Sequence, residues 1–351
     1  MIKRVLALGG ISIGIGMMVC SAPEAAAQQR ATTPTPQRGA ATAAPQRAGA
    51  KSFTPPKTPW GEPDLQGMWP LNHLISTPFQ RQERYGTRRF LTEDEFAAAE
   101  KSAQDRNSRF ESGAIPQADS GGASRLTSLL SDPPNGRFPA LTPKGKELFE
   151  KMRGSYKRGQ TVFDTPEDFD TWDRCITRGL PVSMLTRNYN VGLRVMQSPG
   201  YVVILLEMAH EARIIPTDGR PFIDPSIKQY LGESRGRWEG NTLVVETKNF
   251  NGKPAMTNAG VPGSPPEGLT PATENLRMVE RFTRTANDTV EYKMTVEDPE
   301  VLTSPWSAEF PWKLDPEYGM YEYACHEGNT AIRNYIETSR FERANNKPAA
   351  K

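Results

Sequence analysis

Four ionisable side chains interrupt an apolar stretch near the middle of the chain. Residues 200–215 are mostly aliphatic but carry Glu207, His210, Glu211 and Arg213. Alternation along a regular strand would place both glutamates and the arginine on one face and His210 on the other. Since a buried charge is costly unless it is paired, a glutamate here should find Arg213 or another cation. The pattern indicates an ion-pair network, a solvent-facing edge, or a pocket with Glu207 or His210 as proton carrier and Arg213 as anion binder.

A second group of such residues lies near the C-terminus. The alternating pattern of residues 319–325 predicts a strand, and its parity places Glu322 and His326 together, with Tyr323 on the opposite face. Glu322 is then a candidate to orient His326 as a general base. Packing alone is the other interpretation of the same residues.

Two cysteines connect these groups to a third segment. Cys175 and Cys325 are disulfide candidates in an oxidising compartment, and the bridge would close a loop of roughly 150 residues. Two unrelated buried thiols are the alternative, and neither cysteine lies in a recognisable nucleophile motif. A bridge would bring Asp173 and Arg174 close to Glu322 and His326, which makes all four candidate site residues.

Aromatic side chains, among them Trp238 and Tyr323, offer surface for an apolar or sugar-like ligand, although aromatic residues of sheets are often core. The chain has three histidines and none of the common metal-binding, phosphate-binding, dinucleotide or serine-nucleophile motifs. We therefore expect no metal site and no cofactor.

The N-terminus has the organisation of an export signal. Lys3 and Arg4 precede an apolar run over residues 5–19, and small residues lead up to Ala27, after which we expect cleavage. The protein should then be periplasmic or secreted, with no integral membrane span after processing. Lipidation at Cys20 and an uncleaved anchor are the alternatives.

Charge divides unevenly along the 351 residues, which carry 43 Lys and Arg against 41 Asp and Glu. Residues 28–58 contain five basic residues, no acid and little to bury, and are expected to be a disordered linker. Residues 59–351 hold 36 basic and 40 acidic side chains, which argues against nucleic-acid binding. A mean hydropathy of -0.60 excludes a polytopic membrane protein.

Helices are expected in the N-terminal third of the remaining chain and at its end. A capping box at Thr92 opens a helix to about 106, and Thr142 caps another to about 154. The prediction also includes a short third helix over residues 164–175 and a final helix near 330–340. We expect a long surface loop over 107–141 and a disordered tail over 343–351.

From about residue 190 the apolar period changes to two, which is typical of strands. Residues 200–215 form one long strand or two around a bend. Two hairpins are expected, with turns at residues 239–241 and 286–288, and further strands at 306–312 and 319–325. The fold class is therefore mainly β, an antiparallel meander closing into a barrel or a strongly curved sheet, with helices inserted at about 92–175. Gly67-Met68-Trp69 before the meander is lipocalin-like or calycin-like, and an open sandwich is the alternative.

Several blocks between residues 60 and 340 resemble a family of exported bacterial proteins without assigned function. They include Trp172-Asp173-Arg174-Cys175, Gly236-Arg237-Trp238-Glu239-Gly240 and Tyr321-Glu322-Tyr323-Ala324-Cys325-His326-Glu327. The resemblance implies a single exported unit, here residues 59–342, and no particular reaction.

Three functions from different classes are compatible with these residues. The first is an exported protein that binds a small molecule, with hydrophobic molecules among the candidates. The second is a metal-independent hydrolase, isomerase or lyase that uses His326 or His210 with Glu322 or Glu207. The third is a cell-envelope interaction module. We expect a monomer or weak homo-oligomer with a small-molecule ligand.

Overall fold

The computed structural model describes residues 53–113, 121–187, 189–253 and 270–345. The expected signal peptide and nearly all of the expected linker lie outside the described residues. Residues Lys51–Lys351 cluster as one compact unit. No helix in the described ranges is both long and apolar enough to span a bilayer.

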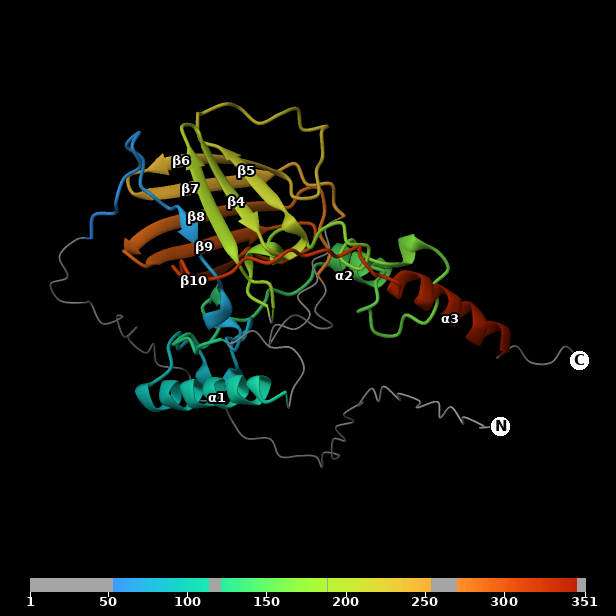
Figure 1. The fold of residues 1–351 in the computed structure, drawn as a ribbon. Helices are drawn as coiled ribbons and strands as arrows, with labels where there is room; N and C mark the ends of the chain where they lie inside the picture. The colour runs from blue at the N-terminus through green and yellow to red at the C-terminus, as the bar shows by residue number, and fades with distance from the viewer. Residues whose placement is uncertain (1–52, 114–120, 188, 254–269, 346–351) are drawn as a thin grey trace, which may run out of the picture. The chain divides into compact units, whose positions relative to one another are not determined.

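Two antiparallel sheets dominate the structure, which confirms a mainly β protein (Figure 1). The smaller sheet has the order β1-β3-β4-β5 and the larger has the order β2-β10-β9-β8-β7-β6. The strands of the smaller sheet are β1 (Gly67–Met68), β3 (Leu193–Ser198), β4 (Tyr201–Leu206) and β5 (Ala212–Pro216). Those of the larger sheet are β2 (Leu130–Asp132), β6 (Glu233–Glu239), β7 (Thr242–Lys248), β8 (Arg277–Ala286), β9 (Thr289–Glu297) and β10 (Trp306–Lys313).

Tight turns set the register of the larger sheet, as the sequence predicts. β6 and β7 pair from Glu239 opposite Thr242, and Gly240 in the turn has φ +60°, a conformation that favours glycine. β8 and β9 pair through Thr289 in the same way, with a register shift just before the turn. Both expected hairpins and the strand of β10 are therefore confirmed.

The core lies between the two sheets, whose strands cross in Figure 1. Inward residues of the smaller sheet, such as Val202 and Ile204, belong to one buried cluster with Leu243, Phe282 and Trp312 of the larger sheet. No hydrogen-bonded ladder joins the two sheets within the described ranges, so a closed barrel is not found. The arrangement is two facing sheets, closer to the sandwich alternative.

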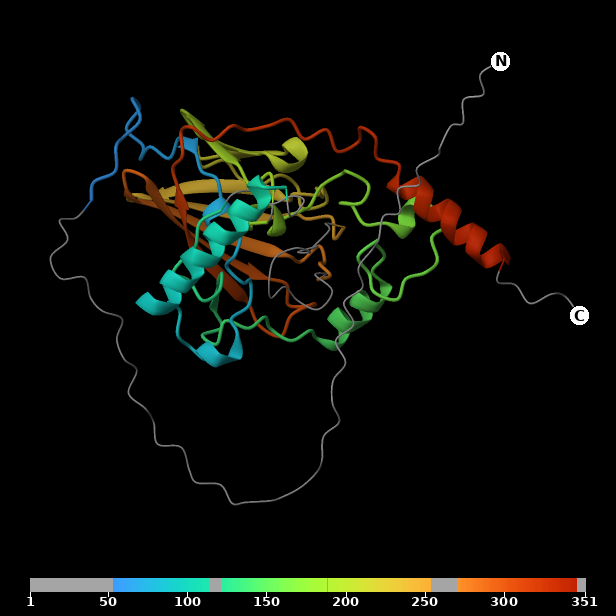
Figure 2. The same ribbon diagram turned by 60° about the horizontal axis from the view of Figure 1, so that its bottom comes forward.

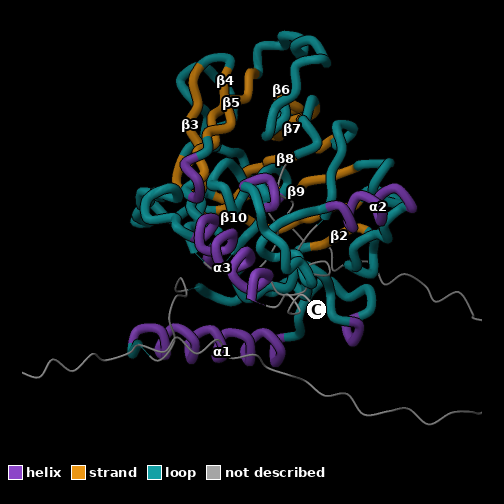
Figure 3. The backbone as a smooth tube through the Cα atoms, turned by 90° about the vertical axis from the view of Figure 1, so that its right-hand side faces the viewer, coloured by secondary structure: helices purple, strands orange, loops and turns teal. Residues whose placement is uncertain are grey.

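Three helices lie at the margins of the sheets: α1 (Glu93–Glu111), α2 (Pro143–Lys151) and α3 (Ala331–Asn345) (Figures 2 and 3). The predicted capping box is present, because Glu95 N–H donates to Thr92 Oγ1 and Thr92 N–H donates to the Glu95 carboxylate. Thr142 caps α2 through Gly145 N–H at 2.9 Å. These helices are confirmed, although α3 continues through Asn345, so the expected disordered tail was placed too early.

Three predicted elements are wrong. The third helix is only a 3-10 turn over Pro166–Asp168, because the Asp168 carboxylate accepts the backbone N–H groups of residues 164 and 165 and the chain extends at Phe169. No strand is assigned over 319–325, since the N–H groups of Tyr321 and Tyr323 donate to side chains and the Cys325 N–H donates within the segment. The segment 107–141 is not a surface loop throughout, because Leu129 and Leu130 are fully buried beside β10.

Candidate functional site

The apolar stretch breaks into two strands around a strained bend, the second of its two predicted forms. β4 ends at Leu206, Ala209 and His210 adopt φ of +64° and +51°, and β5 begins at Ala212. The Leu206 N–H donates to the Glu211 carbonyl at 2.8 Å and closes the bend. Regular alternation is lost here, so the ionisable residues of this stretch go to different places.

Glu207 is a buried acceptor with no cationic partner among the described residues, contrary to the expectation of an ion pair. Its side chain is 1% exposed, and each oxygen accepts two hydrogen bonds. Oε1 accepts from Asn190 Nδ2 at 3.0 Å and Tyr321 N–H at 3.1 Å. Oε2 accepts from Gly192 N–H at 2.9 Å and the Tyr318 hydroxyl at 2.8 Å. A Cβ at Gly192 would lie 2.8 Å from that oxygen, so glycine permits the approach.

Arg213 does form a buried ion pair, but with a residue of the other sheet. Its Nη1 donates to Glu280 Oε1 at 2.8 Å, and the Tyr292 hydroxyl donates to the same oxygen at 2.8 Å. Burial alone would lower the pKa of Arg213, but the Glu280 carboxylate outweighs it and raises that pKa. Arg213 is thus committed to the core, which fits the network interpretation rather than ligand binding.

A small aromatic cluster packs beside the bend, apart from the main core. Trp172 and Met208 are its buried members, and Tyr189 and Tyr323 pack against them. The Tyr323 ring lies 5.9 Å from Trp172 and 6.4 Å from Tyr189, centroid to centroid. The Tyr323 N–H donates to the exposed His210 ring at 3.1 Å. Burial, then a hydrogen bond with Tyr189, raises the pKa of Tyr323.

Two arginines that the sequence analysis did not single out are buried in this region. Arg178 is 5% exposed and Arg187 is 4% exposed, and neither forms an ion pair within the described part of the chain. The Arg178 guanidinium lies 4.0 Å above the Trp172 ring, and its Nε and Nη1 have no hydrogen-bond partner. Arg187 donates from Nη2 to the Val182 carbonyl at 2.6 Å. Burial lowers the pKa of both groups, and the charge of Arg178 adds to the effect on Arg187.

A small cavity of about 10 Å³ lies between the two arginines and Glu207, with room for roughly one water-sized group. Its polar lining consists of Arg178, Ser183, Arg187, Asn190 and Glu207. Glu211 lies nearby, where Ser183 Oγ donates to it at 3.4 Å and Thr177 also hydrogen-bonds to it. Burial raises the pKa of Glu211.

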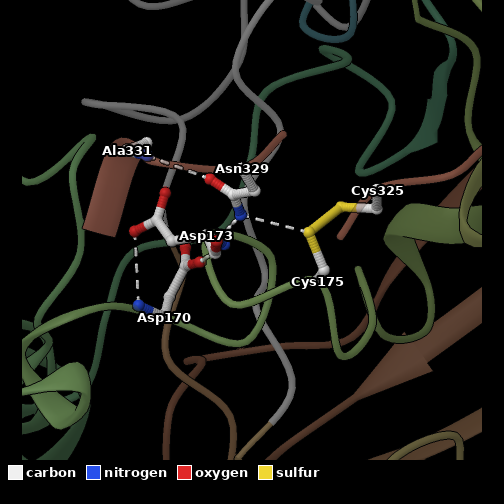
Figure 4. Close-up of a disulfide and its surroundings, with 6 residues drawn as sticks. All are labelled: Asp170, Asp173, Cys175, Cys325, Asn329 and Ala331. Atoms are coloured by element: carbon white, nitrogen blue, oxygen red, sulfur yellow. Dashed lines mark hydrogen bonds between the residues drawn. A yellow bond between two sulfur atoms is a disulfide. The ribbon is translucent and has the colours of Figure 1, made fainter. Parts of the chain in front are cut away.

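The predicted disulfide is present and brings the expected segments together (Figure 4). Cys175 and Cys325 are bonded with a Cα–Cα distance of 5.6 Å. Asn329 Nδ2 donates to the Asp173 carbonyl at 3.2 Å and to Cys175 Sγ at 3.3 Å, and its Oδ1 accepts from the first residue of α3. The disulfide thus anchors the start of α3 against residues 170–175.

Other candidates are not drawn into a common site. Glu322 and His326 are exposed, and no hydrogen bond joins them in the part of the chain that the structure describes. Arg174 donates to the Asp170 carbonyl at 3.3 Å, and Asp173 accepts from Ser155 N–H at 2.8 Å, which are local structural roles. Trp238 packs against the main core. No group of three or more potential metal-ligating residues occurs over the described ranges.

A signal for the missed arginines does exist in the sequence. Arg178 and Arg187 bracket the apolar segment 179–186, whose residues are mostly buried. An arginine beside a short run that must enter the core is a candidate for burial, and two such arginines need anionic or carbonyl partners. No protein-family model, curated protein or solved structure matches this chain, so the site is interpreted from its own geometry.

Proposed function

We propose that this is an exported protein that binds a small molecule through an anionic head group held by Arg178 and Arg187. The carrying observation is that two guanidinium groups are buried together without an ion pair among the described residues. Arginine keeps its proton in proteins, so both groups carry charge in a site that strips most of their water. An anion between them would supply the missing acceptors.

The residues around the two arginines suit an organic ligand. The unpaired Nε and Nη1 of Arg178 lie on different edges of the guanidinium plane, and each would donate a charge-assisted hydrogen bond to an anionic oxygen. The half-buried rings of Tyr189 and Tyr323 pack against the cluster of Trp172 and Met208, and the Arg178 guanidinium lies over the Trp172 ring. The cavity of about 10 Å³ has room for one oxygen atom of the head group, and the aromatic cluster offers apolar surface to the rest of the molecule.

We place the ligand at this site and not in the interior of a lipocalin-like barrel. The space between the sheets is filled by Trp69, Phe282, Trp312 and their neighbours, which leaves a cavity of only about 10 Å³ there with no polar lining. A ligand with an anionic group would find no charged residue in the lining of that space. We therefore propose the bend beside the disulfide as the binding site.

The test is calorimetric titration of the purified protein with sodium acetate, sodium benzoate and inorganic phosphate. Charge-assisted hydrogen bonds contribute about 1.5–3 kcal/mol each, so Arg178→Gln or Arg187→Gln should weaken binding roughly 10- to 100-fold. Arg333→Gln on the exposed face of α3 is the matched control and should bind as the unchanged protein does.

Thermal unfolding of each variant establishes that it is folded before its affinity is compared. If no probe binds, or if both arginine variants bind with unchanged affinity, the proposed site is wrong.

A further inference from the structure

The four charged side chains that line or adjoin the cavity balance before any ligand binds. Arg178 and Arg187 contribute two positive charges, and Glu207 on the cavity wall with Glu211 beside it contribute two negative charges when both are ionised. Asp170 also acts on Arg178 but is not one of the lining residues. An anion that enters this buried site therefore leaves it with one uncompensated negative charge. In a desolvated environment such an excess is costly, and proton uptake by a nearby group relieves it.

The two carboxylates differ in their capacity to take that proton. Glu207 accepts two hydrogen bonds at each oxygen, so both oxygens already face two donors. A proton added to either Glu207 oxygen would point at a group that already donates a hydrogen bond to that oxygen. Glu211 has three hydrogen-bond partners, Thr177, Ser183 at 3.4 Å and the backbone of Arg178, and burial disfavours its charge.

Charged groups and hydrogen-bond donors from several segments of the chain surround Glu211. Arg187 and, from β5, Arg213 act on it as positive charges, but Arg213 is already neutralised by Glu280. Thr177, Ser183 and the backbone of Arg178 contribute hydrogen bonds. His210 is adjacent in sequence but exposed. An anion bound to Arg187 therefore competes directly with Glu211 for the one cation that compensates it.

We propose that the ligand is a monocarboxylate and that it binds together with one proton, which is taken from solvent onto the Glu211 carboxylate. The inference rests on the proposed function. One carboxylate and one proton restore the balance of two positive and two negative charges. A phosphate dianion or a dicarboxylate would still leave one excess negative charge after Glu211 is protonated, so the site should prefer monoanions.

The experiment is calorimetric titration with sodium benzoate in two buffers of different ionisation enthalpy, at about pH 7. The buffer dependence of the measured heat gives the number of protons taken up, which we expect to approach one per bound benzoate. Affinity should rise by up to about tenfold for each unit that the pH falls, until Glu211 is already protonated in the free protein.

Glu211→Gln should abolish the uptake and flatten the pH profile while benzoate still binds. Glu327→Gln, which removes an exposed carboxylate from the segment after the disulfide, is the control and should change neither.

The possible outcomes distinguish the anion site from its coupling to a proton. If the unchanged protein binds none of the probes, the anion site itself is wrong. Benzoate binding without proton uptake, or with the same uptake in Glu211→Gln, overturns the proton coupling and leaves the anion site in place. Tighter binding of phosphate than of benzoate overturns the monocarboxylate preference.

Discussion

Replacement of Glu207 by glutamine should lower the free energy of unfolding strongly, although the side chain hardly changes shape. Glu207→Gln keeps the size of the side chain but replaces one acceptor oxygen with an NH₂ group. Each oxygen accepts from two donors, so whichever side receives the NH₂ group loses two hydrogen bonds and faces donor against donor. The lost bonds tie the Tyr318–Tyr321 segment to the start of β3.

The expected cost follows from this count. Hydrogen bonds to a charged group contribute about 1.5–3 kcal/mol each, and losing two costs about 3–6 kcal/mol of unfolding free energy. Tyr318→Phe removes one donor and should cost about half as much. The latter variant keeps the measurement usable if Glu207→Gln does not fold.

Urea unfolding followed by tryptophan fluorescence measures these differences, and hydrogen exchange should show faster exchange at the Tyr321 amide. Glu297→Gln, on an exposed strand position, is the control. A loss below about 1 kcal/mol in Glu207→Gln would refute the view that the carboxylate fastens this segment.

Three further changes test other parts of the structure by denaturation. Cys175→Ser with Cys325→Ser should lower the unfolding free energy by up to about 5 kcal/mol on the loop-entropy model, and no loss relative to the oxidised protein would contradict it. Glu280→Ala leaves Arg213 buried and unpaired and should cost about 3–5 kcal/mol, part of which Arg213→Met restores in the double variant; an additive loss would argue against their coupling. The raised pKa of Glu211 favours its neutral form in the folded protein, so its contribution to stability is present below the ordinary glutamate pKa and is lost as pH rises through the raised value. Glu211→Gln should lack that loss, and identical pH profiles would refute it.

Local patterns predicted most of the regular elements. The turn residues between β6 and β7 and between β8 and β9 fix both hairpins, because few residues tolerate such turns. The Thr92 capping box and the Thr142 cap likewise mark helix starts by a hydrogen bond that is encoded within four residues. The disulfide was predictable because only two cysteines remain after the expected signal peptide.

The site depended on contacts between distant segments, which the sequence does not display. The alternating pattern of 319–325 resembles a strand, yet Glu207 and His210 take the N–H groups of Tyr321 and Tyr323 and hold the segment irregular. Parity also fails at the bend, where positive φ at Ala209 and His210 ends the alternation. Arg178 and Arg187 bracket a short run that enters the core, but the partners that they meet there come from distant segments, which the sequence does not display.

The bond between Cys175 and Cys325 makes a covalent ring that contains β3 to β10 and leaves β1 and β2 outside it. A single peptide cut anywhere within that ring would leave the two fragments linked. In a chain that emerges N-terminus first, Cys325 follows every strand of both sheets, so the ring closes only when the last of them is available. The bridge can therefore form only after every strand of both sheets has been synthesised.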